Sequence, residues 1–332
     1  MPVATAQSSL DVDQPTLPVL LEGEARQRET DAISFQFADL IRSKRCFLRA
    51  AWTLNREGII LLKQAVSTEH LNNLNQKIRK LLKNVKRYKT SGIDEIAYLN
   101  LPDRRVLKGY NNFVDADKAV INYRVKRPDG RSGSDAGMID IFHPERLSTD
   151  MDVLIRQALH EDLIGRLVMA ASLTPVEVKC RNLYLNNGVS DTRGYHCDGR
   201  SLKFKSFVFL SDVHRLDIGP YCYVKGSHRN KTSWKRSRHF NASHGISTYE
   251  YSQLEGEAAL PMLASAGDMV LSSQRGAHRG HPQHPDASRS VLVNMYSGGV
   301  GKPVAFCHPT PRDAFSPPVW GRSPPYSGLR RP

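Results

Sequence analysis

The spacing of apolar residues changes from a helical to a strand period near residue 175. Before it, apolar side chains recur every three or four residues and predict helices over 35–56, over 67–85, and over 148–174, with a short apolar strand at 58–63. Beyond it, short apolar runs separated by Gly and polar residues predict strands at 176–186, 202–210, 219–226, 268–273 and 290–296. Helices come first, and antiparallel strands dominate the second half.

These elements predict a fold that is mainly β with appended helices, whose core is a double-stranded β-helix of the jelly-roll or cupin-like kind. The 332 residues suffice for one such domain, which we place at 34–300. Residues 1–33 show no apolar period and predict a disordered or loosely packed N-terminal tail. Residues 301–332 are rich in Pro and predict an extension wrapped on the surface.

Candidate metal ligands lie at two places in the strand region. His196 and Asp198 are two residues apart, so on an extended backbone their side chains face the same cavity. His278 follows the predicted strand at 268–273, and Arg289 opens the last strand. A lone His is more often a polar surface residue. The joint pattern, however, matches the two-His, one-carboxylate set of non-haem Fe(II) oxygenases, which leaves three positions open for a bidentate co-substrate and O2.

At these motifs the chain resembles the phytanoyl-CoA dioxygenase-like family of Fe(II)- and 2-oxoglutarate-dependent oxygenases. Residues 54–83 are similar to the family's opening strand and helix, and the His-x-Asp pair to its first ligand pair. Residues 217–229 resemble its Asn-Gly-Pro and Val-Pro-Gly-Ser-His segments. Residues 267–289 resemble its closing segment, with the usual spacing between the second His and the Arg.

The resemblance implies roles for four residues and a set of cofactors. His196, Asp198 and His278 would be the catalytic residues that bind Fe(II), and Arg289 would bind the distal carboxylate of 2-oxoglutarate, with O2 as the other co-substrate. An Arg fits that carboxylate because its planar fork donates two charge-assisted hydrogen bonds. Many members also carry a Ser or Thr two residues after the second His, whereas this chain has Gly280.

A polar stripe on the first long strand is a second candidate for the cofactor site. Asn182, Tyr184 and Asn186 alternate onto one face of a strand that we expect to be largely buried. Buried amides need hydrogen-bond partners, and 2-oxoglutarate would supply them. An edge strand with solvated Asn side chains is an equally good interpretation.

The substrate is suggested only by the polarity of the expected pocket walls. The net charge is +14, and the segments expected to line the pocket contribute Lys108, Asn111, Arg124 and Arg200 among few aliphatic residues. A hydrocarbon would leave such groups desolvated and unpaired. We therefore expect a polar small molecule, such as a sugar-containing or amino-acid-derived natural product of specialised metabolism.

Three alternatives remain open from the sequence. An acyl-CoA hydroxylase would use the same chemistry on another substrate. A nucleic-acid oxidative demethylase would suit the basic charge, but such enzymes carry a second Arg where this chain has Met295. A non-catalytic cupin-like binding protein would have no need of a complete ligand set. The sequence does not distinguish hydroxylation from desaturation, epoxidation or ring formation, and it does not define the oligomeric state.

Cysteine usage and hydropathy give an expectation about location. The five Cys are odd in number and widely spaced, which favours a reducing compartment over a disulfide framework. No apolar run reaches the ~18 residues of a membrane span, and the N-terminus lacks a basic region followed by an apolar core. We therefore expect a cytoplasmic protein that needs no membrane.

Overall fold

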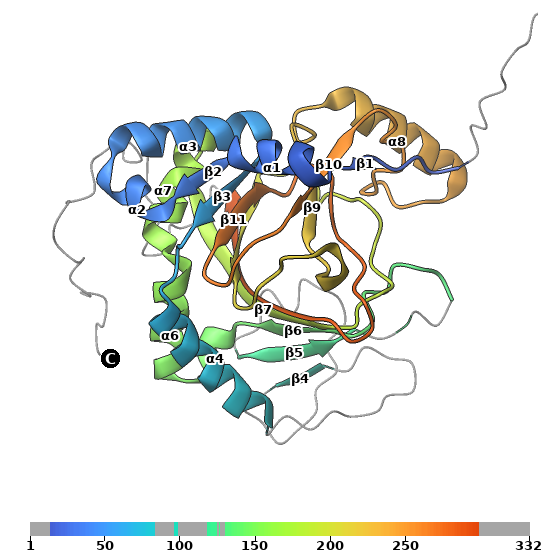
Figure 1. The fold of residues 1–332 in the computed structure, drawn as a ribbon. Helices are drawn as coiled ribbons and strands as arrows, with labels where there is room; N and C mark the ends of the chain where they lie inside the picture. Colours follow the sequence, from blue (N-terminus) through green and yellow to red (C-terminus); the bar gives the residue numbers. More distant parts are fainter. Residues whose placement is uncertain (1–13, 84–95, 99–117, 125, 127–129, 299–332) are drawn as a thin grey trace, which may run out of the picture.

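The computed structural model describes residues 14–83, 96–98, 118–124, 126 and 130–298, and two β-sheets dominate this part of the chain (Figure 1). The larger sheet has nine strands in the order β2-β3-β11-β8-β13-β7-β6-β5-β4, and the smaller has four in the order β1-β10-β9-β12. The strands are β1 (Val19–Leu20), β2 (Ser34–Gln36), β3 (Ile59–Lys63), β4 (Ile96–Tyr98), β5 (Val120–Tyr123), β6 (Met138–Phe142), β7 (Val176–Asn187), β8 (Lys203–Phe209), β9 (Tyr221–Val224), β10 (Ala258–Met262), β11 (Met269–Ser273), β12 (His278–Gly280) and β13 (Ser288–Gly298).

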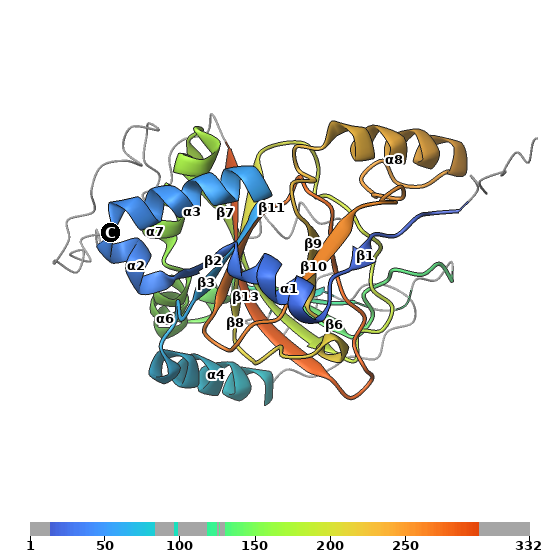
Figure 2. The ribbon, with the colours of Figure 1, turned by 45° about the horizontal axis from the view of Figure 1, so that its top comes forward.

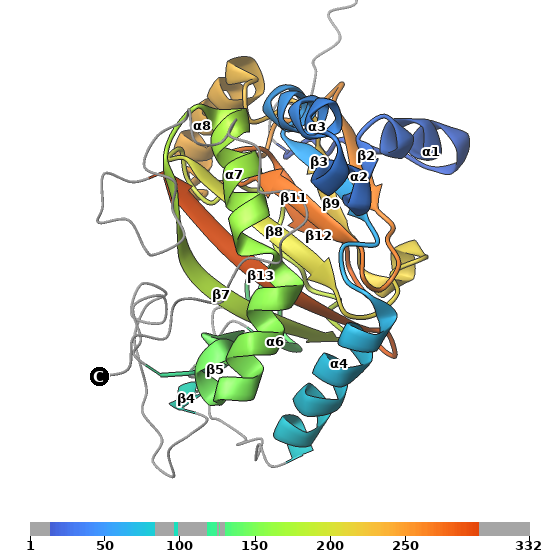
Figure 3. The ribbon, with the colours of Figure 1, turned by 90° about the vertical axis from the view of Figure 1, so that its left-hand side faces the viewer.

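Helices cover the outer face of the larger sheet. Figure 3 shows α3, α7, α6 and α4 lying across it, while Figure 2 shows α8 on the other side of the molecule, beyond β9 and β10. The α-helices are α1 (Gly23–Asp31), α2 (Phe37–Arg42), α3 (Lys44–Glu57), α4 (Thr68–Lys83), α6 (Thr149–Leu159), α7 (Glu161–Ser172) and α8 (Lys231–His244). Two short 3-10 helices lie at Pro144–Leu147 and Leu216–Ile218.

Period-two alternation along the strands divides the core into two layers. On β3, Ile60 and Leu62 face the helices, whereas Ile59 and Leu61 face the smaller sheet. The same alternation turns Leu183 and Leu185 of β7 toward the helices. The polar residues that alternate with these leucines on β7 therefore point into the space between the two sheets, as the sequence predicts.

Two helices expected from the sequence are each divided by a single residue. At Ser43 the backbone is extended (φ −131°), and the Oγ atom accepts a hydrogen bond from the amide of Cys46 at 3.2 Å, which caps α3. At His160 the backbone is left-handed (φ 46°), and this residue separates α6 from α7. The helical spacing of apolar residues continues across both breaks, because the helices on either side of each break pack into the same core.

Two polar segments are more ordered than the sequence suggests. The expected loose tail at 1–33 instead contributes β1, which pairs with β10, and α1 within its described part, 14–33. The polar stretch at 230–255 contains α8, whose first turn is capped by the side chain of Asn230. Within the described residues, no helix is both long enough and apolar enough to cross a membrane. The expected C-terminal extension lies outside the described residues.

Candidate active site

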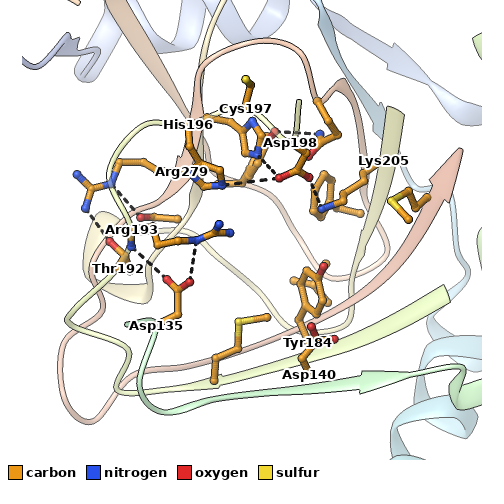
Figure 4. A pocket seen from close by; sticks show the side chains of 18 of the residues that line it. Asp135, Asp140, Tyr184, Thr192, Arg193, His196, Cys197, Asp198, Lys205 and Arg279 are labelled. Atoms are coloured by element: carbon orange, nitrogen blue, oxygen red, sulfur yellow. Dashed lines mark hydrogen bonds and ion pairs between the residues drawn. The ribbon is translucent and has the colours of Figure 1, made fainter. Parts of the chain in front are cut away.

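His196 and His278 are paired in an antiparallel β-bridge at the β12 edge of the smaller sheet. His196 follows β7, His278 begins β12, and each donates its backbone amide to the other's carbonyl at 3.0 Å. The amide of Asp198 donates to the carbonyl of Gln274 at 2.9 Å. These main-chain bonds tie two segments that are 80 residues apart and bring the three predicted ligands to one wall of a cavity (Figure 4).

The three side chains present a compact donor set. The Nδ1 atom of His196 lies 2.8 Å from the carbonyl of Gly194, and that of His278 lies 3.0 Å from the carbonyl of Gly276. These bonds leave the Nε2 atom of each ring available to bind a metal. The two Nε2 atoms lie 3.9 and 4.0 Å from Oδ1 of Asp198. The ligand atoms of the three residues all lie within 4.8 Å of one another. Two neutral imidazoles and a carboxylate fit Fe(II).

Electrostatics keep these donors in the forms that bind a metal. Burial lowers the pKa of His278 to about 4, although the charge of Asp198 opposes that shift. Burial and the neighbouring His278 lower the pKa of His196 well below its usual range. Burial raises the pKa of Asp198, but Lys205 and the two imidazoles outweigh it and hold that pKa well below its ordinary value. Near neutral pH the set is two neutral rings and one anion.

Arg289 reaches into the same cavity from the start of β13. Its Nη1 atom donates to the carbonyl of Gly219, and its Nε atom is buried without an acceptor among the described residues. Burial lowers the pKa of Arg289 to about 10, so the guanidinium is still charged at neutral pH. A Cβ atom at Gly280 would lie 3.9 Å from Nη2 of Arg289 and 4.0 Å from Cγ2 of Thr192. The residue two after His278 therefore does border Arg289, and Thr192 lies beside it.

The polar residues of β7 contact different parts of the structure: two line the cavity, and one bonds to the neighbouring strand β6. Tyr184 and Asn186 line the cavity. Asn182 does not line it; instead its Nδ2 atom donates to Oδ1 of Asp140 on β6 at 2.8 Å. Burial raises the pKa of Asp140 to about 6, against the opposing effect of Asn182 and Arg124. The three residues share the inner face as expected, but they contact different groups.

The predicted substrate-binding residues are placed differently from one another. Arg124 lines the cavity close to Asp140. Arg200 is not among the lining residues; it donates to the hydroxyl of Tyr251 and to the carbonyl of Arg275, at 3.3 and 3.2 Å. Lys108 and Asn111 lie outside the described residues.

Several lining residues were not predicted from the sequence. The cavity has a volume of about 730 Å³ and is also bordered by Arg193, which forms an ion pair with Asp135 at 3.1 Å, and by Lys205, which contacts Asp198. Lys205 could have been found from sequence, because it shares a strand face with Lys203 and follows the His-x-Asp pair closely. The ion pair of Arg193 with Asp135 joins two loops that are distant in the sequence, so no local sequence pattern predicts it.

Comparison with known proteins gives one family match and a set of structural neighbours. The phytanoyl-CoA dioxygenase family matches residues 54–291. No curated protein sequence matches the chain. SnoN, a non-haem α-ketoglutarate-dependent epimerase from nogalamycin biosynthesis, has 14% identity and a TM-score of 0.50 over 77% of this chain and 84% of SnoN.

Two further solved structures have lower TM-scores. AviO1 from Streptomyces viridochromogenes Tue57 has 15% identity and a TM-score of 0.47, covering 77% of this chain and 96% of AviO1. HygX from Streptomyces hygroscopicus, with nickel and 2-oxoglutarate bound, has 10% identity and a TM-score of 0.43, covering 74% of this chain and 85% of HygX.

The fold and the family agree with the predictions from the sequence. The similarity to SnoN shows the fold, and the mainly β, jelly-roll prediction is confirmed. The family match spans more than half of the chain and includes the His-x-Asp pair, His278 and Arg289. The chain therefore belongs to the phytanoyl-CoA dioxygenase family and is a non-haem iron enzyme that uses Fe(II) and 2-oxoglutarate.

Proposed function

We propose that His196, Asp198 and His278 hold Fe(II), that Arg289 binds the distal carboxylate of 2-oxoglutarate, and that the enzyme oxidises a polar small molecule of specialised metabolism. The observation that carries the proposal is the convergence of the three donor atoms within 4.8 Å on the wall of a cavity that Arg289 also borders. Such a donor set leaves one side of the metal open to co-substrate and O2.

Each cofactor-binding side chain has a stated task. The backbone carbonyls of Gly194 and Gly276 hold the Nδ1 atoms of the histidines, which fixes both rings with Nε2 toward the metal. The buried Nε atom of Arg289 has no acceptor in the part of the chain that the structure describes, and a carboxylate would provide one. When bound, Fe(II), 2-oxoglutarate and O2 supply the oxidising chemistry, in which 2-oxoglutarate is converted to succinate and CO2.

The 2-oxoglutarate site also includes side chains of β7 in this proposal. Tyr184 and Asn186 line the cavity, as Arg289 does. In the pairing of β7 with β13, Asn186 is opposite Arg289. The Nδ2 atom of Asn186 can donate a hydrogen bond to a carboxylate oxygen. Asn182 acts at one remove, because it holds Asp140 instead of facing the cavity.

A polar substrate fits the remaining lining of the cavity. Beyond the proposed cofactor residues, the cavity is bordered by the polar or charged side chains of Arg124, Asp135, Asp140, Arg193, Tyr249 and Glu250, together with the apolar side chains of Met138, Phe207, Phe209, Val291 and Met295. A long acyl chain would desolvate such groups without pairing them, at about 1 to 3 kcal/mol for each group. Hydroxyl, amino or carboxylate groups of a substrate would pair with them, which favours a natural product over an acyl-CoA ester.

The structural neighbour SnoN is a natural-product enzyme with the same fold, and it defines neither the substrate nor the reaction of this chain. SnoN was crystallised with Fe3+, α-ketoglutarate and nogalamycin RO, and it acts in nogalamycin biosynthesis. Its identity of 14% transfers the fold and not the substrate. Hydroxylation is the simplest outcome for this chain; desaturation and ring formation use the same cofactors.

The experiment is a substrate screen coupled to succinate formation. The enzyme is loaded with Fe(II) and supplied with 2-oxoglutarate, O2 and a panel of glycosides, amino acids and their anionic derivatives, with long-chain acyl-CoA esters as the comparison. We expect succinate release above background only with polar compounds, together with an oxidised product in the mass spectrum. Stimulation by acyl-CoA esters alone would contradict the polar-substrate proposal.

A further inference from the structure

Lys205 contacts the carboxylate of the proposed metal ligand Asp198. It lies on β8, two residues after Lys203, so both side chains share the inner face of the larger sheet. Its side chain is only 12% exposed, and its Nζ atom lies 2.6 Å from Oδ2 of Asp198. Figure 4 shows Lys205 approaching Asp198 from the side opposite His196.

The two oxygens of Asp198 have different partners. Oδ2 accepts the hydrogen bond from Lys205, whereas Oδ1 lies 3.9 and 4.0 Å from the Nε2 atoms of His196 and His278. The main chain of Asp198 is held as well, because its carbonyl accepts from Nζ of Lys203 at 3.0 Å. Both lysines of this face therefore bind the same residue, one at the carboxylate and one at the backbone.

We propose that Lys205 is a positioning residue that engages Oδ2 of Asp198 and leaves Oδ1 alone to face the metal. The inference rests on the proposed role of Asp198 as a ligand. A charge-assisted bond to Oδ2 restrains rotation of the carboxylate about its Cβ–Cγ bond, so that Oδ1 stays turned toward the Nε2 atoms of His196 and His278. Without this bond the carboxylate would no longer be held in the orientation that the metal needs.

A competing role for Lys205 makes the opposite prediction about metal affinity. If its ammonium only took the place of the metal cation, removal of Lys205 would strengthen metal binding. The contacts do not support that role, since Lys205 binds the oxygen that is turned away from the imidazoles. If Lys205 instead bound 2-oxoglutarate, its removal would weaken co-substrate binding and leave metal affinity as it was.

The test measures metal binding without turnover. Lys205→Met, Lys205→Arg and the control Lys179→Met are titrated calorimetrically with Mn(II) in the absence of 2-oxoglutarate, and then with 2-oxoglutarate on the Mn(II)-loaded protein. Lys179 lines the same cavity but is 47% exposed and pairs with Glu177 at 3.5 Å, so it is a matched lysine without a ligand contact. Thermal unfolding of each variant shows whether the fold is kept.

We expect Lys205→Met to bind Mn(II) about 10- to 100-fold more weakly than wild type, the range found when the partner of a metal ligand is removed. Lys205→Arg keeps a donor to Oδ2 and should recover most of that loss, and Lys179→Met should bind as wild type does. Unchanged or tighter Mn(II) binding by a folded Lys205→Met variant overturns the inference. Failure of wild-type protein to bind Mn(II) would instead contradict the proposed metal site itself.

Discussion

Replacement of Arg289 by Lys isolates the contribution of the guanidinium fork to 2-oxoglutarate binding. The substitution keeps one positive charge but removes the planar pair of donors, one of which is a buried Nε atom with no acceptor within residues that the structure describes. A hydrogen bond to a charged group contributes about 1.5 to 3 kcal/mol, so the dissociation constant for 2-oxoglutarate should rise about 10- to 150-fold. Burial also disfavours a charged Lys, which increases the loss.

The assay is calorimetric titration of 2-oxoglutarate into Mn(II)-loaded protein, which avoids turnover. The control is Arg215→Lys, because Arg215 is an exposed arginine that pairs only with Asp217 among the interactions described for it. Mn(II) affinity itself should not change in either variant. If 2-oxoglutarate affinity is unaffected by Arg289→Lys while the prime substrate binds more weakly, Arg289 belongs to the substrate site and the reasoning is refuted.

Three further outcomes follow from the packing. Arg181→Met should lower the free energy of unfolding by about 3 kcal/mol in urea titrations, because the buried Glu161 loses the cation that binds both of its oxygens at 2.5 and 2.8 Å and keeps the more distant Arg156 at 3.6 Å; a loss under 1 kcal/mol would contradict this. Gly58→Ala should destabilise the fold measurably, since its φ of 78° is left-handed and the new Cβ would lie 2.5 Å from the hydroxyl of Tyr223. Burial raises the pKa of Asp140 from 3.8 to about 6, so wild-type stability falls as pH rises through that window and Asp140 ionises. The stability of Asp140→Asn relative to wild type should therefore increase by on the order of 2 to 3 kcal/mol between about pH 4 and about pH 7, and a pH-independent difference would show that Asp140 does not titrate there.

The parts of the fold that follow from local spacing could be predicted from the sequence. Alternation along β7 and β13 sets which residues face inward. His196 and Asp198 face one cavity as expected, although they lie in a loop in which only His196 forms an isolated β-bridge. The candidate ligands and Arg289 are residues with distinctive chemistry, and their spacing is similar to that of a known family. These features need no knowledge of how distant segments pack.

The features that escaped prediction depend on contacts between distant segments. Residues 14–33 look like a tail because their apolar residues follow no helical or strand period, yet β1 adds a strand to β10 through backbone hydrogen bonds that any sequence can form. The ion pair of Arg193 with Asp135 joins residues 58 apart. Arg200, expected at the substrate, lies instead over the ring of Trp234 on α8, a helix that the sequence did not predict.

Formation of the Fe(II) and 2-oxoglutarate complex in the absence of O2 tests the central claim most directly. Wild-type protein should develop the visible charge-transfer absorption of Fe(II)-bound 2-oxoglutarate. His278→Ala should lose that band, since His278 supplies one of the three donors, whereas His284→Ala should keep it, because His284 is exposed and pairs with Asp286. A wild-type band in a folded His278→Ala variant would contradict the assignment of the iron site.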